Sequence, residues 1–188
     1  MTNTNVRKIA FAGVIAALYA ALTMALSFIG YGPVQFRVAE VLCILPFFFP
    51  FSVWGLFVGC IVANIMSPYW LDVVVGPIAS LLAALCTMQL GKLKSSDRLS
   101  IKALACFPPV ILNAVFIGAM IAFIMVSEGE ADSFLAAFGV NGVLVGAGQL
   151  TVLYALGLPL MIYLPKSRVF ERISTYMGRE IVERRSLL

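Results

Sequence analysis

The stretch VAEVLCILPFFFPFSVWGLFVGCIVANIM, residues 38–66, decides how often this chain can cross a membrane. It is almost wholly apolar, but Pro46 and Pro50 interrupt it. Because proline removes a helical hydrogen bond and clashes with the preceding turn, no single straight helix is expected here. One crossing takes about 20 apolar residues, so these 29 residues are long for one crossing and short for two. Two short helices, 38–48 and 51–66, fit the pattern, and so does a segment that re-enters the membrane without crossing it.

The rest of the chain is equally apolar. Of the 188 residues, 62% are hydrophobic and 12% are charged, and the mean hydropathy is +1.02. Soluble domains are roughly 45–50% apolar and about 25% charged. The composition therefore indicates one integral membrane domain, residues 1–188, in the cell membrane. Further apolar runs of spanning length cover residues 9–29, 73–91, 103–126 and 134–163.

The positions of the Lys and Arg residues set the predicted orientation. Apart from Arg37, they lie before residue 9, in 92–102 and after 165. The positive-inside rule places these groups in the cytoplasm, so 38–66 must add an even number of crossings, and we favour two. The first run follows basic residues as in a secretory signal, but its length favours a retained span.

The sequence thus predicts an all-α fold, an integral membrane bundle of six transmembrane helices with both termini cytoplasmic. The six predicted spans are 9–29, 38–48, 51–66, 73–91, 103–126 and 134–163. Residues 165–188 are predicted to form a cytoplasmic amphipathic tail. That tail could lie on the membrane surface, against a partner or in solvent.

The residue types present argue against several classes of protein. Histidine is absent, which excludes imidazole-based catalysis and imidazole metal sites. No GxxxxGK[ST], HExxH or GxSxG motif occurs. The cysteines lie in apolar runs without a CxxC pair, and we interpret them as packing residues. We therefore expect a protein that is not an enzyme, with no metal, no cofactor and no nucleic-acid partner, because membrane orientation explains the basic excess.

Arg37 and Glu40 form a charged pair at the start of the second predicted helix. At this spacing they share one helix face. They could form a salt bridge that stabilises the helix end, or they could line a pocket, because ionisable residues near a membrane interior usually mark a ligand pathway. Other polar residues in the outer half could join them or merely bond to backbone carbonyls. These further substrate-binding candidates are Gln35, Asn64, Asp72, Asn113, Asn141 and Gln149, with Tyr31 and Trp70 as rings that could stack on a ligand or belong to the interfacial belt.

Small residues repeat every four positions along the first predicted helix. Ala12, Ala16 and Ala20 form a stripe of the kind that lets helix backbones approach closely. Gly55 and Gly59 repeat the pattern in the third predicted helix. Such a stripe could pack inside the bundle or dock another membrane protein.

Three segments together resemble a known family. YGPVQFRVAEVLCILPFFFP (31–50), WGLFVGCIVANIMSP (54–68) and LDVVVGPIASLLAALCT (71–87) are similar to the queuosine-precursor transporter (QueT) family. Its members are substrate-binding S components of energy-coupling-factor (ECF) transporters. The resemblance covers roughly residues 9–163.

The resemblance implies a six-helix protein that captures its ligand near the outer surface. It implies a transmembrane coupling subunit of the EcfT type, docked through an AxxxA motif that Ala12, Ala16 and Ala20 match, and two ATPase subunits that supply the energy. The S component would then tip within the membrane lipid to open its site inward. The expected ligand is a 7-deazaguanine queuosine precursor, such as queuine or queuosine.

The ring chemistry of such a ligand fits the charged candidates. The ring N1–H and exocyclic amine are adjacent donors, which Glu40 or Asp72 could accept, while Arg37 could donate to the carbonyl oxygen. If the ligand carries an aminomethyl cation, the second carboxylate could neutralise it. An S component for another vitamin, or a membrane protein of an unrelated class, remains the alternative function.

Overall fold

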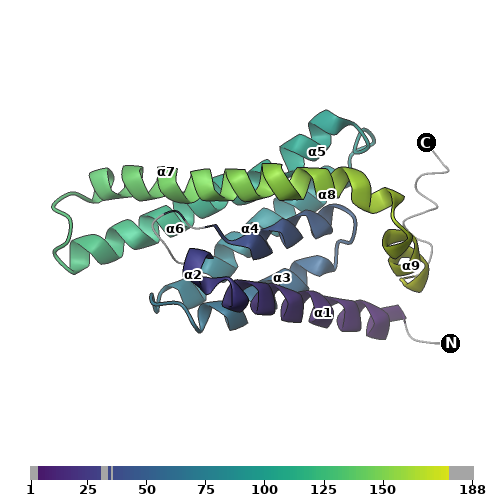
Figure 1. Cartoon of the computed structure of the whole chain (residues 1–188), viewed down its shortest axis with the longest axis horizontal. Coiled ribbons are helices and arrows are strands. Elements are labelled where there is room, and N and C mark those ends of the chain that lie inside the picture. Colours follow the sequence, from purple (N-terminus) through teal and green to yellow (C-terminus); the bar gives the residue numbers. More distant parts are fainter. Residues whose placement is uncertain (1–3, 31–33, 35, 178–188) are drawn as a thin grey trace.

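The computed structural model describes residues 4–30, 34 and 36–177, and within these ranges every regular element is helical (Figure 1). The predicted all-α fold is therefore confirmed. In chain order the elements are α1 (Thr4–Ala25), α2 (Ser27–Gly30), η1 (Val38–Phe47), α3 (Ser52–Asn64), α4 (Asp72–Gly91), α5 (Leu99–Ala105), α6 (Phe107–Ser127), α7 (Phe134–Val152), η2 (Leu153–Gly157), α8 (Leu158–Tyr163), η3 (Leu164–Lys166) and α9 (Arg168–Tyr176).

Within the described part of the chain, four helical stretches are long and apolar enough to cross a membrane. They run over Asn5–Ala25, Asp72–Gly91, Leu99–Ser127 and Phe134–Lys166. Two shorter apolar helices, Val38–Phe47 and Ser52–Asn64, divide the opening stretch of the sequence at its proline turn. The predicted division of 38–66 into two short helices thus agrees with the structure.

The first of these short elements, η1, is a 3-10 helix of ten residues with Pro46 inside it. Such helices rarely exceed four residues, and they rise about 2.0 Å per residue instead of the 1.5 Å of an α-helix. Ten residues therefore extend about 20 Å. Three residues per turn also align Glu40, Cys43 and Pro46 on one face, and all three are buried.

Contacts at both ends show that η1 runs beside α4 along its length. Arg37, which precedes η1, bonds to Asp72 at the start of α4. Phe47, which ends η1, lies so close to Gly91 at the end of α4 that a Cβ atom on this glycine would overlap the Phe47 backbone. The short element is therefore enclosed by the longer helices and forms part of the bundle core.

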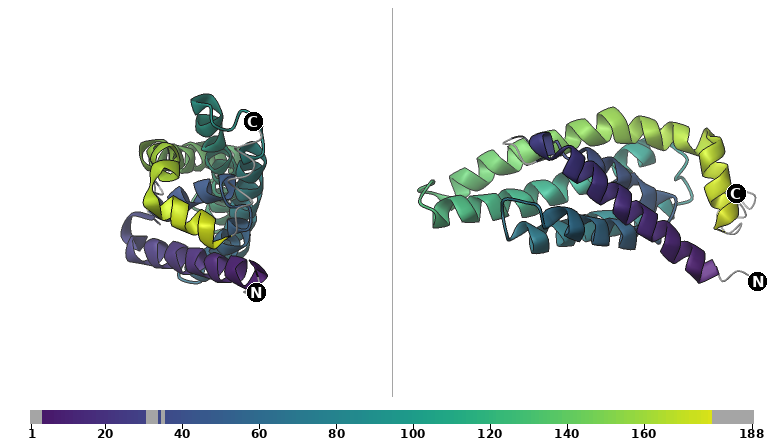
Figure 2. Two further views of the ribbon diagram at one scale, coloured as in Figure 1. Left: turned by 90° about the vertical axis from the view of Figure 1, so that its right-hand side faces the viewer. Right: turned by 60° about the horizontal axis from the view of Figure 1, so that its bottom comes forward.

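Glycine and alanine allow the closest helix pairs. A Cβ atom on Gly118 of α6 would lie 2.7 Å from the Cα atom of Gly142 on α7. A Cβ atom on Gly55 or Gly59 of α3 would lie 2.5 or 2.8 Å from a carbonyl oxygen of α1. Side chains at these glycines would force the helices apart, so the sequence specifies this close packing. Figure 2 shows α1 crossing the rest of the bundle obliquely.

Helix α9 packs against the same end of the bundle at which α1 begins (Figures 1 and 2). The buried Phe170 ring lies 5.4 Å from the Phe48 ring and 5.3 Å from the Phe49 ring. The Arg7 guanidinium donates to the Tyr176 carbonyl at 3.0 Å. From sequence, the tail was expected to lie on the membrane surface, against a partner or in solvent. In the structure, α9 instead packs on an aromatic cluster of its own bundle.

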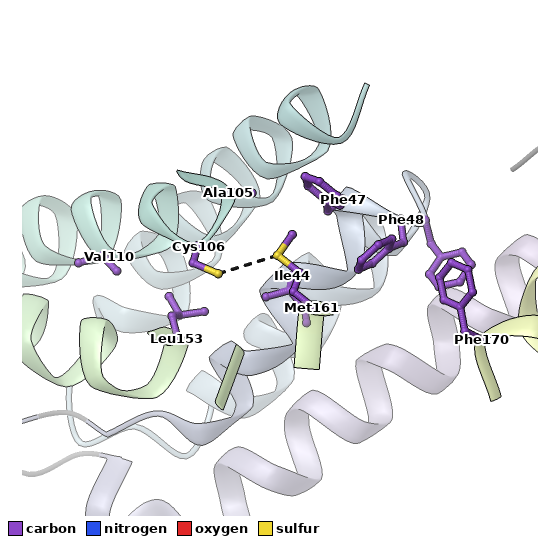
Figure 3. Close-up of a cluster of buried hydrophobic side chains, with 10 residues drawn as sticks. Ile44, Phe47, Phe48, Ala105, Cys106, Val110, Leu153, Met161 and Phe170 are labelled. Atoms are coloured by element: carbon purple, nitrogen blue, oxygen red, sulfur yellow. Dashed lines mark hydrogen bonds between the residues drawn. The ribbon is translucent and has the colours of Figure 1, made fainter. Parts of the chain in front are cut away.

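This aromatic cluster continues into the bundle interior (Figure 3). Cys106 lies within it and contacts Met161 at 3.9 Å between the sulfur atoms. That environment agrees with the interpretation of Cys106 as a packing residue.

Candidate ligand-binding site

A buried ion pair joins the start of η1 to the start of α4. Arg37 Nη2 donates to Asp72 Oδ2 at 2.5 Å, and the two side chains are 3% and 1% exposed. Charges buried in a membrane bundle are costly unless paired, so this contact fixes the relative position of the two elements. Sequence spacing drew attention to Arg37 with Glu40, but the acid that binds Arg37 here lies 35 residues further along the chain.

Glu40 is fully buried beside this pair and is held by two other donors. Tyr19 of α1 donates its hydroxyl to Oε1 at 2.5 Å, and the Cys43 thiol donates to Oε2 at 2.9 Å. The 3-10 geometry of η1 explains the second contact, because residues three apart eclipse each other. Sequence reasoning missed Tyr19. The sequence feature that could have indicated it is a single tyrosine in a mostly apolar span, four residues before Thr23.

Residues of α3 and α4 complete this network. Asn64 Nδ2 donates to the Asp72 carbonyl at 2.8 Å and lies 3.5 Å from Cys60 Sγ. Ser80 Oγ lies 3.4 Å from the same sulfur, and the Tyr19 hydroxyl lies 3.7 Å from it. Cys60 therefore has a polar environment, unlike the packing role expected from sequence. We call the set the buried polar cluster, formed by Tyr19, Arg37, Glu40, Cys43, Cys60, Asn64, Asp72 and Ser80.

Gly76 is required for this arrangement, because it lies one turn after Asp72 on α4. A Cβ atom at this position would overlap the Asn64 amide and lie 2.8 Å from Asp72 Oδ1. Only a residue without a side chain leaves room for both groups. Gly76 is thus a positioning residue that sequence reasoning did not single out.

Several buried amide and carboxyl atoms have no hydrogen-bond partner among the described residues. Three are acceptors, Asn64 Oδ1, Asp72 Oδ1 and Gln149 Oε1, and one is a donor, Asn113 Nδ2. Buried polar groups are usually hydrogen-bonded, so each unpaired atom needs an explanation. A bound ligand with complementary groups would form hydrogen bonds with these atoms. Two serine hydroxyls, on Ser52 and Ser174, are also buried without a partner.

Comparison with known proteins places these features in a family. The model of the family described as QueT transporter matches residues 9–166. The chain belongs to the QueT transporter family. The resemblance based on 31–50, 54–68 and 71–87 is thereby confirmed, and with its apolar helices the chain is a multi-pass membrane protein of a transporter family.

A curated QueT relative gives a partial match. The protein named Queuosine precursor transporter QueT from Lactococcus lactis subsp. cremoris (strain MG1363) is 40% identical over 83 residues. This stretch covers 43% of the present chain and 49% of the relative, so the match spans about half of the relative's length. No solved structure matches the chain.

The remaining candidate residues of this QueT family member lie apart from the buried polar cluster or outside the described residues. Asn141 Nδ2 donates to the Ala137 carbonyl at 2.8 Å, which is the backbone contact that sequence reasoning offered as its alternative. Trp70 is 77% exposed, which favours an interfacial ring over one that stacks on an enclosed ligand. Tyr31 and Gln35 lie outside the described residues.

The alanine stripe of α1 faces α3 along one edge. The backbones of Ala12 and Ala16 form the surface on which Gly55 and Gly59 pack, and Ala20 is buried. One position further along the helix, a second series of small residues is exposed, namely Gly13, Ala17, Ala21 and Ala25. An apolar groove of about 340 Å³ lies between α1 and α3, and its lining includes Gly13, Ala16 and Trp54.

Proposed function

We propose that this chain is the substrate-binding S component of an ECF-type importer that takes up a queuosine precursor. Membership of the QueT transporter family supports the substrate class, since a relative carries that substrate in its name. The observation that carries the site is the buried Arg37–Asp72 pair beside Glu40. Such charges inside an apolar bundle are expensive to bury and are typical of a ligand site.

The chemistry of a 7-deazaguanine ring suits these groups. Its N1–H and exocyclic amine form an adjacent donor pair, and Asp72 Oδ1 and Asn64 Oδ1 are buried acceptors without a partner in the structure. Arg37 is a donor that a ring carbonyl oxygen could accept from. On α6 and α7, Asn113 Nδ2 and Gln149 Oε1 offer one further donor and one further acceptor.

We further propose six crossings with both termini in the cytoplasm. The course of η1 beside α4, from Asp72 to Gly91, supports a full crossing of the 38–66 region over a re-entrant segment. The contact between Arg7 and Tyr176 brings α1 and α9 to one end of the bundle, as an even number of crossings requires. Both helices carry basic residues, which the positive-inside rule assigns to the cytoplasm.

The exposed side of α1 is the proposed docking face for a coupling subunit with two attached ATPases. Ala12, Ala16 and Ala20 lie partly against the bundle, so the accessible small residues are Gly13, Ala17 and Ala21. Together with the groove beside α3, they leave a smooth apolar surface for a partner helix. Energy would come from the partner ATPases while this chain binds the ligand and tips in the bilayer.

Calorimetric titration of the purified protein with 7-deazaguanine bases tests the binding proposal. Binding of at least one base is expected, and Glu40→Gln is expected to weaken it by about 2 kcal/mol or more, as loss of a charged partner does. The absence of binding by a folded sample would refute the proposed substrate. Unchanged affinity of the Glu40→Gln variant would remove Glu40 from the site.

A further inference from the structure

The groove between α1 and α3 is an unfilled apolar feature on the outside of the bundle. The two helices lie side by side (Figure 1), and the groove between them has a volume of about 340 Å³. The small residues Gly13, Ala16 and Gly55 leave this space free, and the larger exposed side chains of Ile9 and Trp54 border it. The other lining residues are Lys8, Ala12, Phe51 and Val58. An empty groove loses dispersion contacts along its lining, so an apolar occupant is favoured.

The groove runs along the helix axes. Its lining residues on α1 recur every four positions, at Lys8, Ala12 and Ala16, and positions four apart lie above one another on one helix face. Trp54 and Val58 repeat this spacing on α3. From Lys8 to Ala16 the helix rises about 12 Å. Because spanning helices are tilted by at most about 40° from the bilayer normal, the groove follows the direction of lipid acyl chains.

One end of the groove is positively charged. Lys8 is the charged residue of its lining, and the Lys8 ammonium lies 5.9 Å from the centroid of the Phe51 ring, which directly precedes α3. Helices α1 and α3 contain no Asp or Glu, whereas α1 contains Arg7 and Lys8. The groove is therefore apolar along its length and cationic at the end where both helices begin.

The residues at this end are typical of headgroup depth. Lys8 directly precedes the apolar run 9–29, and Trp54 lies in the first turn of α3 with its ring 62% exposed. Tryptophan is enriched at membrane interfaces, and a lysine near a helix end extends its ammonium towards the headgroups. A cation at headgroup depth above an apolar groove is complementary to a phospholipid, whose phosphate lies above its acyl chains.

We propose that this groove binds one acyl chain of an anionic phospholipid, with the lipid phosphate on the Lys8 ammonium. The ammonium has three donors for phosphate oxygens. Phosphatidylcholine fits the apolar part equally well but brings its own choline cation, so it gains less from Lys8. A partner helix on the exposed side of α1 would cover the groove, so the lipid is the occupant of the free chain. The proposal is independent of the transported substrate.

Quenching of Trp54 fluorescence by brominated lipids tests this proposal, because Trp54 lines the groove. The sequence contains two tryptophans, so the full chain with Trp70→Phe reports on Trp54 alone. This protein is reconstituted in phosphatidylcholine bilayers that contain a small fraction of either dibrominated phosphatidylglycerol or dibrominated phosphatidylcholine. Phosphatidylglycerol is expected to associate about fivefold more strongly, the preference that one cation near the headgroups confers. Lys8→Gln is expected to reduce this ratio to near one.

Further variants separate the groove from general electrostatics. A Cβ atom on Gly13 would meet nothing within 4 Å, so Gly13→Leu extends into the groove without a clash at its Cβ atom, and it should also lower the preference for phosphatidylglycerol. Gly139→Leu on α7, where a Cβ atom is equally free of contacts, should retain the preference, as should Lys94→Gln in the loop after α4.

Three results would overturn the proposal. Equal association of the two lipids with the native groove would show that the groove accepts any acyl chain. A preference that survives both Lys8→Gln and Gly13→Leu would place the anionic lipid elsewhere. Absence of quenching by either lipid would show that the groove is closed to lipid, as it would be if a second copy of the chain covered it.

Discussion

The substitution Gly76→Ala tests whether Asn64 and Asp72 belong to the ligand site. The added methyl group would overlap the Asn64 amide and lie 2.8 Å from Asp72 Oδ1, well inside van der Waals contact. Asn64 must then move, and its 2.8 Å bond to the Asp72 carbonyl is lost. A lost hydrogen bond costs about 1 kcal/mol, whereas replacing glycine by alanine inside a helix returns about 0.5–1 kcal/mol.

Overpacking of this kind costs about 1–3 kcal/mol, so we expect Gly76→Ala to be destabilised by about this amount and its ligand affinity to fall. Displacement of one charged contact would weaken binding roughly 10- to 150-fold. Thermal unfolding and calorimetric titration of the same preparation measure the two quantities separately. Gly139→Ala on α7 is the matched control, because its Cβ atom would meet nothing within 4 Å, and it should keep full affinity. Native affinity in a folded Gly76→Ala variant would refute the assignment of Asn64 and Asp72 to the site.

Three further predictions concern Tyr19, the exposed face of α1 and helix α9. Tyr19→Phe removes the donor to Glu40 and should lower the free energy of unfolding by about 1.5–3 kcal/mol, measured by thermal unfolding against the exposed-site control Tyr163→Phe; equal stability of the two variants would contradict the role of this bond. Ala17→Trp should abolish co-purification with a coupling subunit and leave ligand binding intact, whereas Val143→Trp at an exposed position on α7 should preserve both; a complex that survives Ala17→Trp would exclude the α1 face as the docking surface. Phe170→Ala should release α9 from the aromatic cluster and cost about 3 kcal/mol of stability, detected as earlier unfolding and faster proteolysis after α8, and unaltered proteolysis would show that Phe170 does not hold α9.

The helical architecture could be predicted from sequence because it depends on local patterns. Long apolar runs gave the spanning helices to within a few residues, and two prolines divided 38–66 as found. These signals are local, since a helix satisfies its backbone hydrogen bonds within one segment and a membrane demands that it does. The 3-10 geometry of η1 was not predicted, because the same residues are equally compatible with an α-helix.

The candidate site was only partly predictable because its contacts are long-range. The sequence identified Arg37, Glu40 and Asp72 as the charged residues of the otherwise apolar region 9–91, and the structure brings them together. Which acid binds Arg37 depends on how η1 lies against α4, and no spacing rule contains that information. Tyr19 was missed for the same reason, since its partner lies on another helix.

The alanine stripe shows how sensitive such interpretations are to helix rotation. A shift of one residue turns an α-helix by about 100°. Ala16 packs towards α3, whereas Ala17 is exposed. Small residues at adjacent positions therefore mark a helix suited to close packing, but the packed side becomes known only once neighbouring helices are placed.

The 3-10 form makes η1 longer than an α-helix of the same number of residues. If its ten residues relaxed to α-helical geometry, η1 would shorten by about 5 Å. The angle between Glu40 and Cys43 around the axis would change by about 60°. Such a contraction would draw Arg37 away from Asp72 and reorient the Glu40 carboxylate relative to the Cys43 thiol without moving the long helices. A change of helical geometry within this one short segment would thus be enough to disrupt the buried polar cluster.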